Sequence, residues 1–231
     1  MTEITWRKHP DPGQMAEAVA NDVAAIVNDA VVASGQSLIA LPGGRSPLPV
    51  FDKLAALVLP WDKVTVIPTD DRLVTVDSPL SNFAVLTRYF SFLGADLIPL
   101  ATDDKDHHVA AQQADARLRQ TPWPPDLVWL GMGADGHTAS IFPGPDLTDA
   151  LETMARVAGV LPDPLPPEAP VPRITLSRAA ITAASAIMLT IQGPAKRSVL
   201  EHALEEGAAS TTPVGRVLAQ ARRPVTIHWS E

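Results

Sequence analysis

Short apolar runs alternate with helical patterns along most of this chain, and this alternation constrains the possible folds more than any other feature. The runs that predict strands cover residues 37–41, 64–68, 97–100, 126–131, 186–191 and 225–229. Apolar residues at spacings of three and four predict helices that cover about 15–34, 50–58, 83–90, 106–119 and 195–205. Strands that alternate with helices favour a mainly parallel sheet covered on both faces, here in one domain over residues 1–231.

The composition narrows the functional classes. Apolar residues make up 46% of the chain, enough for a sizeable core, and the absence of cysteine excludes disulfides and thiolate chemistry. The net charge of −8 argues against nucleic-acid binding, which depends on clustered Lys and Arg. The sequence shows neither the apolar core of a signal peptide nor a run of the roughly 20 apolar residues that a membrane span needs. We therefore expect a cytoplasmic protein, a monomer or weak homodimer, with a small-molecule partner and no membrane contact.

A proline-rich segment covers residues 161–172, where half of the residues are proline. Proline excludes a helix interior or a central strand, so this segment is predicted to be an extended surface loop that could cover a site. A domain linker is less favoured, because the strand–helix pattern resumes on both sides.

Ligands of parallel sheets bind where loops leave the carboxyl ends of strands, so these loops hold the candidate sites. The first loop contains Gly43 and Gly44, whose backbone N–H groups can approach a ligand, and Arg45, whose charge folding does not require. Ser46 is predicted as the N-cap and Pro47 as the first residue of the next helix. The loop therefore predicts an anion site at a helix N-terminus, with a plain capped glycine turn as the alternative.

A second polar segment, Thr69-Asp70-Asp71-Arg72, directly follows a predicted strand. Two carboxylates beside a guanidinium at the carboxyl end of a strand suit the recognition of a hydroxylated ligand. A solvated charged loop is the alternative interpretation.

A third loop, residues 131–140, carries three glycines after a predicted strand. The glycines force a tight turn and leave Asp135, His137 and small hydroxyl residues as its chemically active side chains. A histidine with a carboxylate two residues away can act as a general base and its orienting group. The alternative is a loop histidine without a role.

The fourth segment begins a predicted helix at Pro194 and places Lys196 and Arg197 in its first turn. Cations are unfavourable there because the helix dipole prefers acids, so a bound anion would explain them. The alternative is that both side chains point to water. Arg173, which follows the proline-rich segment, is a weaker candidate for the same basic cluster.

Two adjacent histidines, His107 and His108, lie beside Asp103, Asp104 and Asp106. They could bind a metal, but we interpret them as solvated side chains at the start of a polar helix. No metal site is predicted from the spacing of the other histidines and carboxylates.

Taken together, these segments resemble the 6-phosphogluconolactonases. The resemblance covers about residues 40–200 and rests on PGGRSP at 42–47, TDDR at 69–72, SN at 81–82, GMGADGHTASIFP at 131–143, RITLS at 173–177 and GPAKR at 193–197. It implies a three-layer α/β/α sandwich of modified Rossmann type. It also implies hydrolysis of 6-phosphoglucono-δ-lactone to 6-phosphogluconate in the oxidative pentose phosphate pathway, with no metal and no organic cofactor.

The resemblance also implies roles for single residues. His137 matches the proposed catalytic histidine of the family. The matching phosphate and sugar contacts are Gly44, Arg45, Ser46, Arg72, Arg173 and Lys196, to which we add Gly43, Asp70 and Asn82 as candidate ligand contacts. The family often has Thr where Ser46 stands and Glu where Asp71 stands, so the partner of Asp71 could differ here.

We expect neutral His137 to take a proton from the water that attacks the lactone carbonyl, and then to protonate the departing ring oxygen. Asp135 either orients the imidazole or contacts the sugar, and the sequence leaves both roles open. Backbone N–H groups of a glycine-rich loop are expected to stabilise the tetrahedral oxyanion.

Two other functions remain as alternatives. The sugar-phosphate deaminases of the same superfamily resemble this chain, but their histidine is paired with a glutamate shortly after it. Here no carboxylate follows His137 until Asp146. The second alternative is a non-catalytic sugar-phosphate-binding module, which the presence of Asp135 and His137 argues against.

Overall fold

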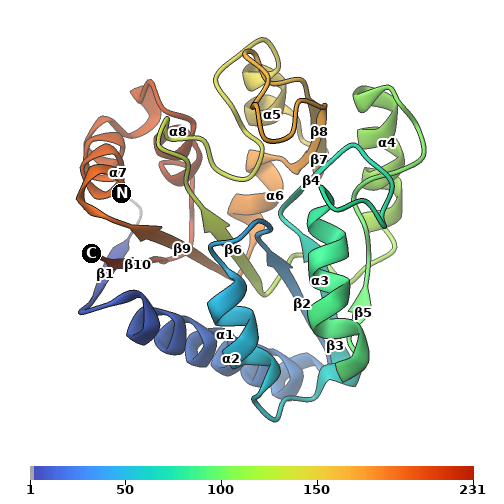
Figure 1. Cartoon of the computed structure of the whole chain (residues 1–231), viewed down its shortest axis with the longest axis vertical. Helices are drawn as coiled ribbons and strands as arrows, with labels where there is room; N and C mark the ends of the chain where they lie inside the picture. The colour runs from blue at the N-terminus through green and yellow to red at the C-terminus, as the bar shows by residue number, and fades with distance from the viewer. Residues whose placement is uncertain (1–2) are drawn as a thin grey trace.

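The computed structural model describes residues 3–231 and builds them around a central parallel sheet (Figure 1). Within this range the sheet has seven strands, all parallel to their neighbours. Their spatial order is β1 (Ile4–His9), β10 (Val225–Ser230), β9 (Ala186–Gln192), β6 (Leu127–Gly131), β2 (Ser37–Leu41), β3 (Val64–Pro68) and β5 (Asp96–Leu97). The predicted parallel sheet is confirmed.

Helices cover both faces of this sheet. One face carries α1 (Pro12–Ser34), α2 (Leu48–Ala55) and α3 (Asn82–Phe90). The other carries α4 (His107–Leu118), α5 (Leu147–Glu152), α6 (Arg178–Ala183), α7 (Pro194–Glu206) and α8 (Pro213–Leu218). Short 3₁₀ turns lie at η1 (Trp61–Lys63), η2 (Ser91–Leu93) and η3 (Gly207–Ala209). In Figure 1, α1 and α2 lie below the sheet, and α5, α6 and α8 lie above it.

The alternation of side chains along β2 separates the two apolar cores. Ile39 and Leu41 pack with α1, α2 and α3, whereas Leu38 and Ala40 pack with the helices of the opposite face. All four side chains are buried, because a parallel strand between two helical layers has no face in water. The fold is therefore the three-layer α/β/α sandwich that the sequence predicted. None of the helices in residues 3–231 is both long and apolar enough to cross a membrane.

Three elements begin or end close to their predicted positions. Helix α1 ends at Ser34 and is followed by Gly35 in the left-handed conformation. Helix α4 begins after Asp106, whose carboxylate accepts hydrogen bonds from the backbone N–H groups of His108 and Val109. Helix α7 begins at Pro194.

A small antiparallel sheet beside the main one was not predicted. It pairs β4 (Asp70–Arg72) with β8 (Arg173–Leu176), which in turn pairs with β7 (Val157–Val160). The sequence predicted a polar loop at 69–72, and this prediction is wrong because β4 pairs with residues a hundred positions away. Strand β1 and helices α5, α6 and α8 were also missed, since each is short and lacks a clear apolar period.

The Asp71 side chain fastens β4 to the start of α3. Its Oδ1 accepts hydrogen bonds from the backbone N–H groups of Arg72 at 2.8 Å and Asn82 at 2.6 Å. Its Oδ2 accepts from the Ser81 hydroxyl and from the Phe83 N–H, both at 3.0 Å. Burial raises the pKa of Asp71 to about 6, against the effect of these donors, so the side chain is ionised at neutral pH. Asp71 is thus not the solvated carboxylate of the alternative interpretation.

We expect Ser81→Ala to lower the free energy of unfolding by about 1–2 kcal/mol. The Ser81 hydroxyl is buried, caps α3 by accepting from the Ala84 N–H at 3.1 Å, and donates to Asp71. Urea denaturation at pH 7 measures the change. Ser91→Ala removes an exposed hydroxyl at the opposite end of the same helix and should change stability by less than about 0.5 kcal/mol. Equal midpoints for both variants would contradict this role of Ser81.

The buried side chain of His228, on β10, contacts His9 of β1 and Asp22 of α1. His228 is fully buried, and its ring lies parallel to that of His9, with Nδ1 3.1 Å from His9 Nε2. Its Nε2 lies 3.1 Å from the Asp22 carboxylate, which also pairs with Arg7 at 2.6 Å. Burial lowers the pKa of His228 to about 4 and outweighs the attraction of Asp22, so the ring is neutral at neutral pH.

This lowered pKa predicts a loss of stability in acid. Between pH 6.5 and 4 the unfolded chain binds a proton at position 228 that the folded chain does not, so stability falls as the pH falls. At pH 4 the loss amounts to about 3 kcal/mol. We expect His228→Phe to remove this component from urea denaturation measured at pH 4–7. His202→Gln, which changes an exposed histidine, should keep it, and identical pH profiles for the wild type and His228→Phe would refute the assignment.

Candidate active site

A cavity of about 560 Å³ opens at the carboxyl ends of β2, β3, β6 and β9, four neighbouring strands of the sheet. Here the chain runs from β2 to β3 on one side, while β6 and β9 lie on the other, which is the switch point where parallel sheets bind ligands. The predicted site residues that line the cavity are Gly43, Gly44, Ser46, Asp70, Arg72, Asn82, His137 and Lys196. Arg45, Asp135 and Arg173 lie outside its lining.

His137 and Asp135 form a hydrogen-bonded pair at the cavity. The imidazole Nδ1 lies 2.6 Å from Asp135 Oδ1, and the His137 backbone N–H donates to the same oxygen at 3.2 Å. The bond from His137 lowers the pKa of Asp135, which keeps this carboxylate ionised. An ionised acceptor at Nδ1 favours the tautomer that leaves Nε2 free to accept a proton. Since His137 lines the cavity and Asp135 does not, the geometry favours the orienting role over sugar contact.

Close packing in the glycine-rich loop holds this pair. A Cβ atom at Gly133 would lie 2.2 Å from the His137 ring and 2.5 Å from the Asp135 carboxylate. Only glycine therefore allows the loop to turn this tightly around the two side chains. On its other side the His137 ring packs against Phe142, with ring centroids 4.2 Å apart.

The loop after β2 presents free backbone donors. Within residues 3–231, the N–H groups of Gly43, Gly44, Arg45 and Ser46 have no hydrogen-bond partner. Gly44 adopts a φ of 82°, which turns the chain and allows consecutive N–H groups to converge. Such a concave set of donors suits a phosphate or another anion.

The predicted helix start after this loop is wrong. Helix α2 begins at Leu48 with Pro47 at the N-cap, and the Ser46 side chain makes no cap hydrogen bond. Carbonyl groups of Arg45 and Pro47 accept from the first helical N–H groups instead, so the turn caps itself. Ser46 is exposed and lines the cavity, where its hydroxyl is available to a ligand.

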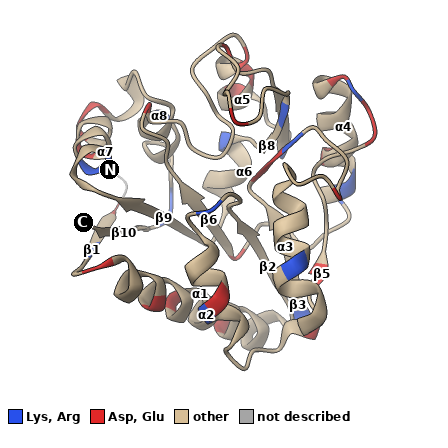
Figure 2. Cartoon of the chain, in the orientation of Figure 1, with Lys and Arg blue, Asp and Glu red and all other residues tan. Residues whose placement is uncertain are grey.

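A polar network fixes the wall formed by β4 and α3. Arg72 donates to Asn82 Oδ1 at 3.1 Å and to the Leu80 carbonyl at 2.7 Å. Asn82 Nδ2 donates to the Asp70 carbonyl at 2.8 Å, and the Ser140 hydroxyl donates to Asp70 Oδ2 at 2.6 Å. Acidic and basic residues therefore adjoin along β4, as Figure 2 shows in the segment between β8 and α3.

The two cations at the start of α7 have different surroundings. Lys196 reaches into the cavity and donates to the Met132 carbonyl at 2.7 Å, which leaves two of its three protons for a ligand. Arg197 pairs with Glu201 at 2.7 Å and stacks over Trp229, 4.7 Å from the ring centroid. Only the first of the two thus faces a potential anion.

Arg173 contacts the proline-rich loop rather than the cavity. Its guanidinium is buried and donates to the carbonyl groups of Ala169 and Val171 at 2.7 and 2.6 Å. Burial, together with the nearby charge of Arg72, lowers the pKa of Arg173 to about 10, so it stays charged at neutral pH. Its ligand contact stays a prediction. The loop itself is confirmed as irregular and contributes Glu168 to the cavity lining.

Sequence reasoning missed several cavity residues. Gln192 ends β9 and could have been found from the rule that ligands bind at the carboxyl ends of parallel strands. Met15 in α1 and Glu168 in the proline-rich loop carry no such signal. In the part of the chain that the structure describes, the only group of three potential metal ligands is His107, His108 and Asp146, and none of them lines this cavity.

Comparison with known proteins identifies the family. Residues 10–229 match the family described as glucosamine-6-phosphate isomerases/6-phosphogluconolactonase. The 6-phosphogluconolactonase of Mesorhizobium japonicum is 37% identical over 97% of this chain and 94% of its own, and that of Pseudomonas putida is 36% identical over 95% and 90%.

Solved structures agree with this match. The crystal structure of a 6-phosphogluconolactonase from Shewanella baltica superposes with a TM-score of 0.91 at 32% identity, covering 99% of this chain and 98% of its own. A monomeric glucosamine-6-phosphate deaminase shares the fold, with a TM-score of 0.78 at 17% identity over 98% of this chain and 97% of its own. This chain therefore belongs to the glucosamine-6-phosphate isomerase/6-phosphogluconolactonase family.

Proposed function

We propose that this chain is a 6-phosphogluconolactonase, which hydrolyses 6-phosphoglucono-δ-lactone to 6-phosphogluconate in the oxidative pentose phosphate pathway. The observation that carries the proposal is His137, which lines the cavity with Nδ1 bound by Asp135 and Nε2 without a partner in the described residues. The relatives with this name match over nearly the whole chain.

The proposed reaction needs no covalent intermediate, because a lactone is an activated ester. His137 Nε2 takes a proton from water as the water oxygen bonds to the lactone carbonyl carbon. Unbonded backbone N–H groups of a glycine-rich loop at the cavity stabilise the resulting oxyanion; those of Gly133 and Gly136 are not among them, because they already donate to the carbonyl groups of His137 and Gly133. The bond from this carbon to the ring oxygen then breaks, and His137 returns the proton to that oxygen. Asp135 stabilises the imidazolium between the two transfers.

The phosphate group of the substrate places the carbonyl. Gly43, Gly44 and Ser46, whose backbone N–H groups are free in the described residues, line the same cavity as Arg72 and Lys196, which supply positive charge. Asp70 and Asn82 offer hydrogen bonds to sugar hydroxyls. Fixing the phosphate positions the reacting carbon next to His137, which raises the rate by orienting the substrate.

The deaminase alternative lacks its second carboxylate. The first carboxylate after His137 in the sequence is Asp146, and it lies beside His107 at 3.6 Å and the Leu161 N–H at 2.7 Å. It therefore has its own partners away from the catalytic histidine. A hydrolysis that needs one histidine and its orienting aspartate fits the cavity better.

We also propose that the protein works in the cytoplasm as a monomer or weak homodimer, without a nucleic-acid partner and with no metal or organic cofactor in the reaction. The net charge of −8 supports the absence of nucleic-acid binding. Light scattering after size-exclusion chromatography measures the oligomeric state.

The activity is tested by proton release from 6-phosphoglucono-δ-lactone in weak buffer with EDTA, against the spontaneous background. We expect fast hydrolysis by the wild type and a kcat lower by about 10²–10⁴-fold in His137→Ala, because the variant lacks the general base. Unphosphorylated glucono-δ-lactone should react far more slowly, since it lacks the group that the basic residues hold.

His202→Ala is the matched control, because His202 is also near a carboxylate, Glu206, but is exposed on α7. It should keep wild-type activity. A loss of less than about threefold in His137→Ala would remove His137 as the base. Absence of any acceleration by the wild type would leave the sugar-phosphate-binding module as the better explanation.

We expect Lys196→Ala to raise KM by about tenfold or more with a smaller change in kcat, because it removes a charged contact made equally in the ground and transition states. Initial rates over a range of lactone concentrations measure both constants. Arg197→Ala, one residue further along, removes a cation held by Glu201 and Trp229 and should leave KM unchanged. An unchanged KM in Lys196→Ala would exclude it from the phosphate site.

A further inference from the structure

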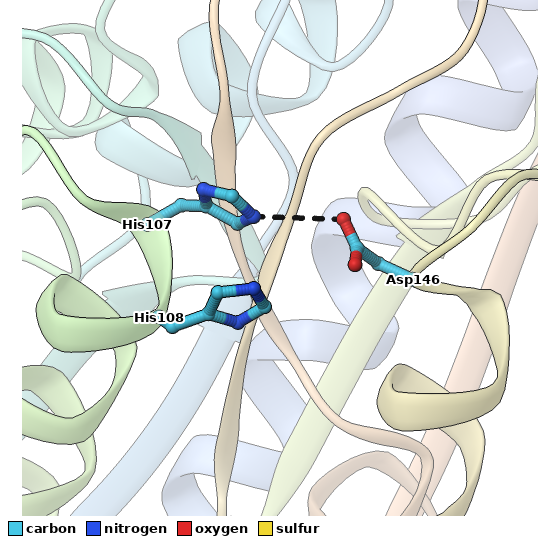
Figure 3. Close-up of side chains that lie close together, drawn as sticks. All are labelled: His107, His108 and Asp146. Carbon is cyan, nitrogen blue, oxygen red and sulfur yellow. Dashed lines mark ion pairs between the residues drawn. The ribbon is translucent and has the colours of Figure 1, made fainter.

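Two histidines and an aspartate converge at the edge of the molecule where α4 and α5 begin. His107 and His108 are the first residues of α4, and Asp146 directly precedes α5 (Figure 3). His107 Nε2 lies 3.6 Å from Asp146 Oδ2, and the two imidazole centroids are 4.1 Å apart. One ligand atom from each of the three residues lies within 4.8 Å of the other two.

Contacts with the backbone of neighbouring segments hold His107 and Asp146 in place. Strand β7 passes so close to the start of α4 that a Cβ atom at Gly159 would lie 2.2 Å from the His107 carbonyl oxygen. Asp146 Oδ2 accepts a hydrogen bond from the Leu161 N–H at 2.7 Å. The carboxylate is thereby oriented by a second contact, as metal-binding carboxylates commonly are.

The donor set and the spacing suit a transition metal. Imidazole nitrogen and carboxylate oxygen bind Zn²⁺ at about 2.0–2.2 Å, which places the ligands of a tetrahedral site about 3.4 Å apart. The His107–Asp146 distance of 3.6 Å is close to this value, and a ring nitrogen of the exposed His108 lies within 4.8 Å of a ligand atom of each of the other two residues. Asp149 and Glu152 line a surface cavity together with His108, so a cation has an acidic approach from solvent.

We propose that His107, His108 and Asp146 form a binding site for a divalent transition metal of the zinc class, separate from the lactone cavity. Water completes the coordination. The bound ion ties the start of α4 to the start of α5. Through the contact between Asp146 and Leu161 it also steadies the first residue of the proline-rich loop. The site has a structural role, because none of its three ligands lines the cavity that holds His137.

The competing explanation is a simple ion pair between protonated His107 and Asp146. Such a pair needs neither His108 nor a metal, and the two explanations differ in what the protein binds. The chain has no cysteine, so a metal titration is not confused by thiolates.

The test is calorimetric titration of the chelator-treated whole protein with zinc chloride at pH 7.5. We expect one zinc ion per chain at this site, lost or weakened at least tenfold in His107→Ala and in Asp146→Asn. Asp146→Asn keeps an oxygen for the Leu161 N–H, so it tests the ligand without breaking that contact. Cobalt(II) added instead of zinc should give visible absorption bands that the same variants lose.

Thermal unfolding supplies a second readout. Zinc at about 100 times its dissociation constant should raise the Tm by about 5–10 °C in the wild type and not in Asp146→Asn. The matched control is His202→Ala, which breaks a His–carboxylate pair of 3.2 Å that has no third ligand among residues 3–231. It should retain both the binding and the Tm shift. No zinc binding by the wild type, or equal binding by the wild type and Asp146→Asn, would overturn the proposal and leave the ion pair.

Discussion

Burial of both faces of β2 is the constraint on which the rest of the structure depends. The strand is paired on its two edges by β3 and β6 and covered on its two faces by helices, so it meets solvent only at its ends. The carboxyl end of β2 therefore leads into a loop. The chain continues to β3 on one side of β2 and later to β6 on its other side, so the loops that follow these strands diverge and leave room for a ligand. The loop after β2, the glycine-rich loop after β6 and Lys196 of α7 all line this one opening.

The polar residues around the opening support one another rather than the ligand alone. The carboxylate oxygens of Asp71 accept hydrogen bonds from the backbone of β4 and of the start of α3. Asn82 and Arg72 are therefore held in place before any ligand binds. Ser140 connects the glycine-rich loop 131–140 to Asp70 in the same way. Side chains that are already fixed by such contacts lose little conformational entropy when a ligand binds. They also need not reorient during a reaction, which lowers its barrier.

Sequence reasoning succeeded where the determining contacts are local. The period of apolar residues identified the parallel sheet, and the pair Asp135–His137 lies two positions apart in one glycine-rich turn. It failed where the partners are distant. The pairing of β4 with β8, the loop contacts of Arg173 and the approach of Asp146 to His107 each join segments that no local pattern relates. The prediction for Ser46 failed for a different reason. Serine is a common N-cap residue, but here backbone carbonyl groups of the preceding turn accept from the first N–H groups of α2, and the Ser46 side chain makes no cap hydrogen bond.

The position of β10 has a consequence for how the chain acquires its fold. This strand lies between β1 and β9, so Ile4 finds its partner only in Val225, near the opposite end of the sequence. During synthesis β1 has no sheet to join until β10 has been made, although α1, β2 and β3 already have neighbours. Contacts of such long sequence separation slow folding. We therefore expect the edge of the sheet that carries His9 and His228 to form last, after the central strands β6, β2 and β3 have paired.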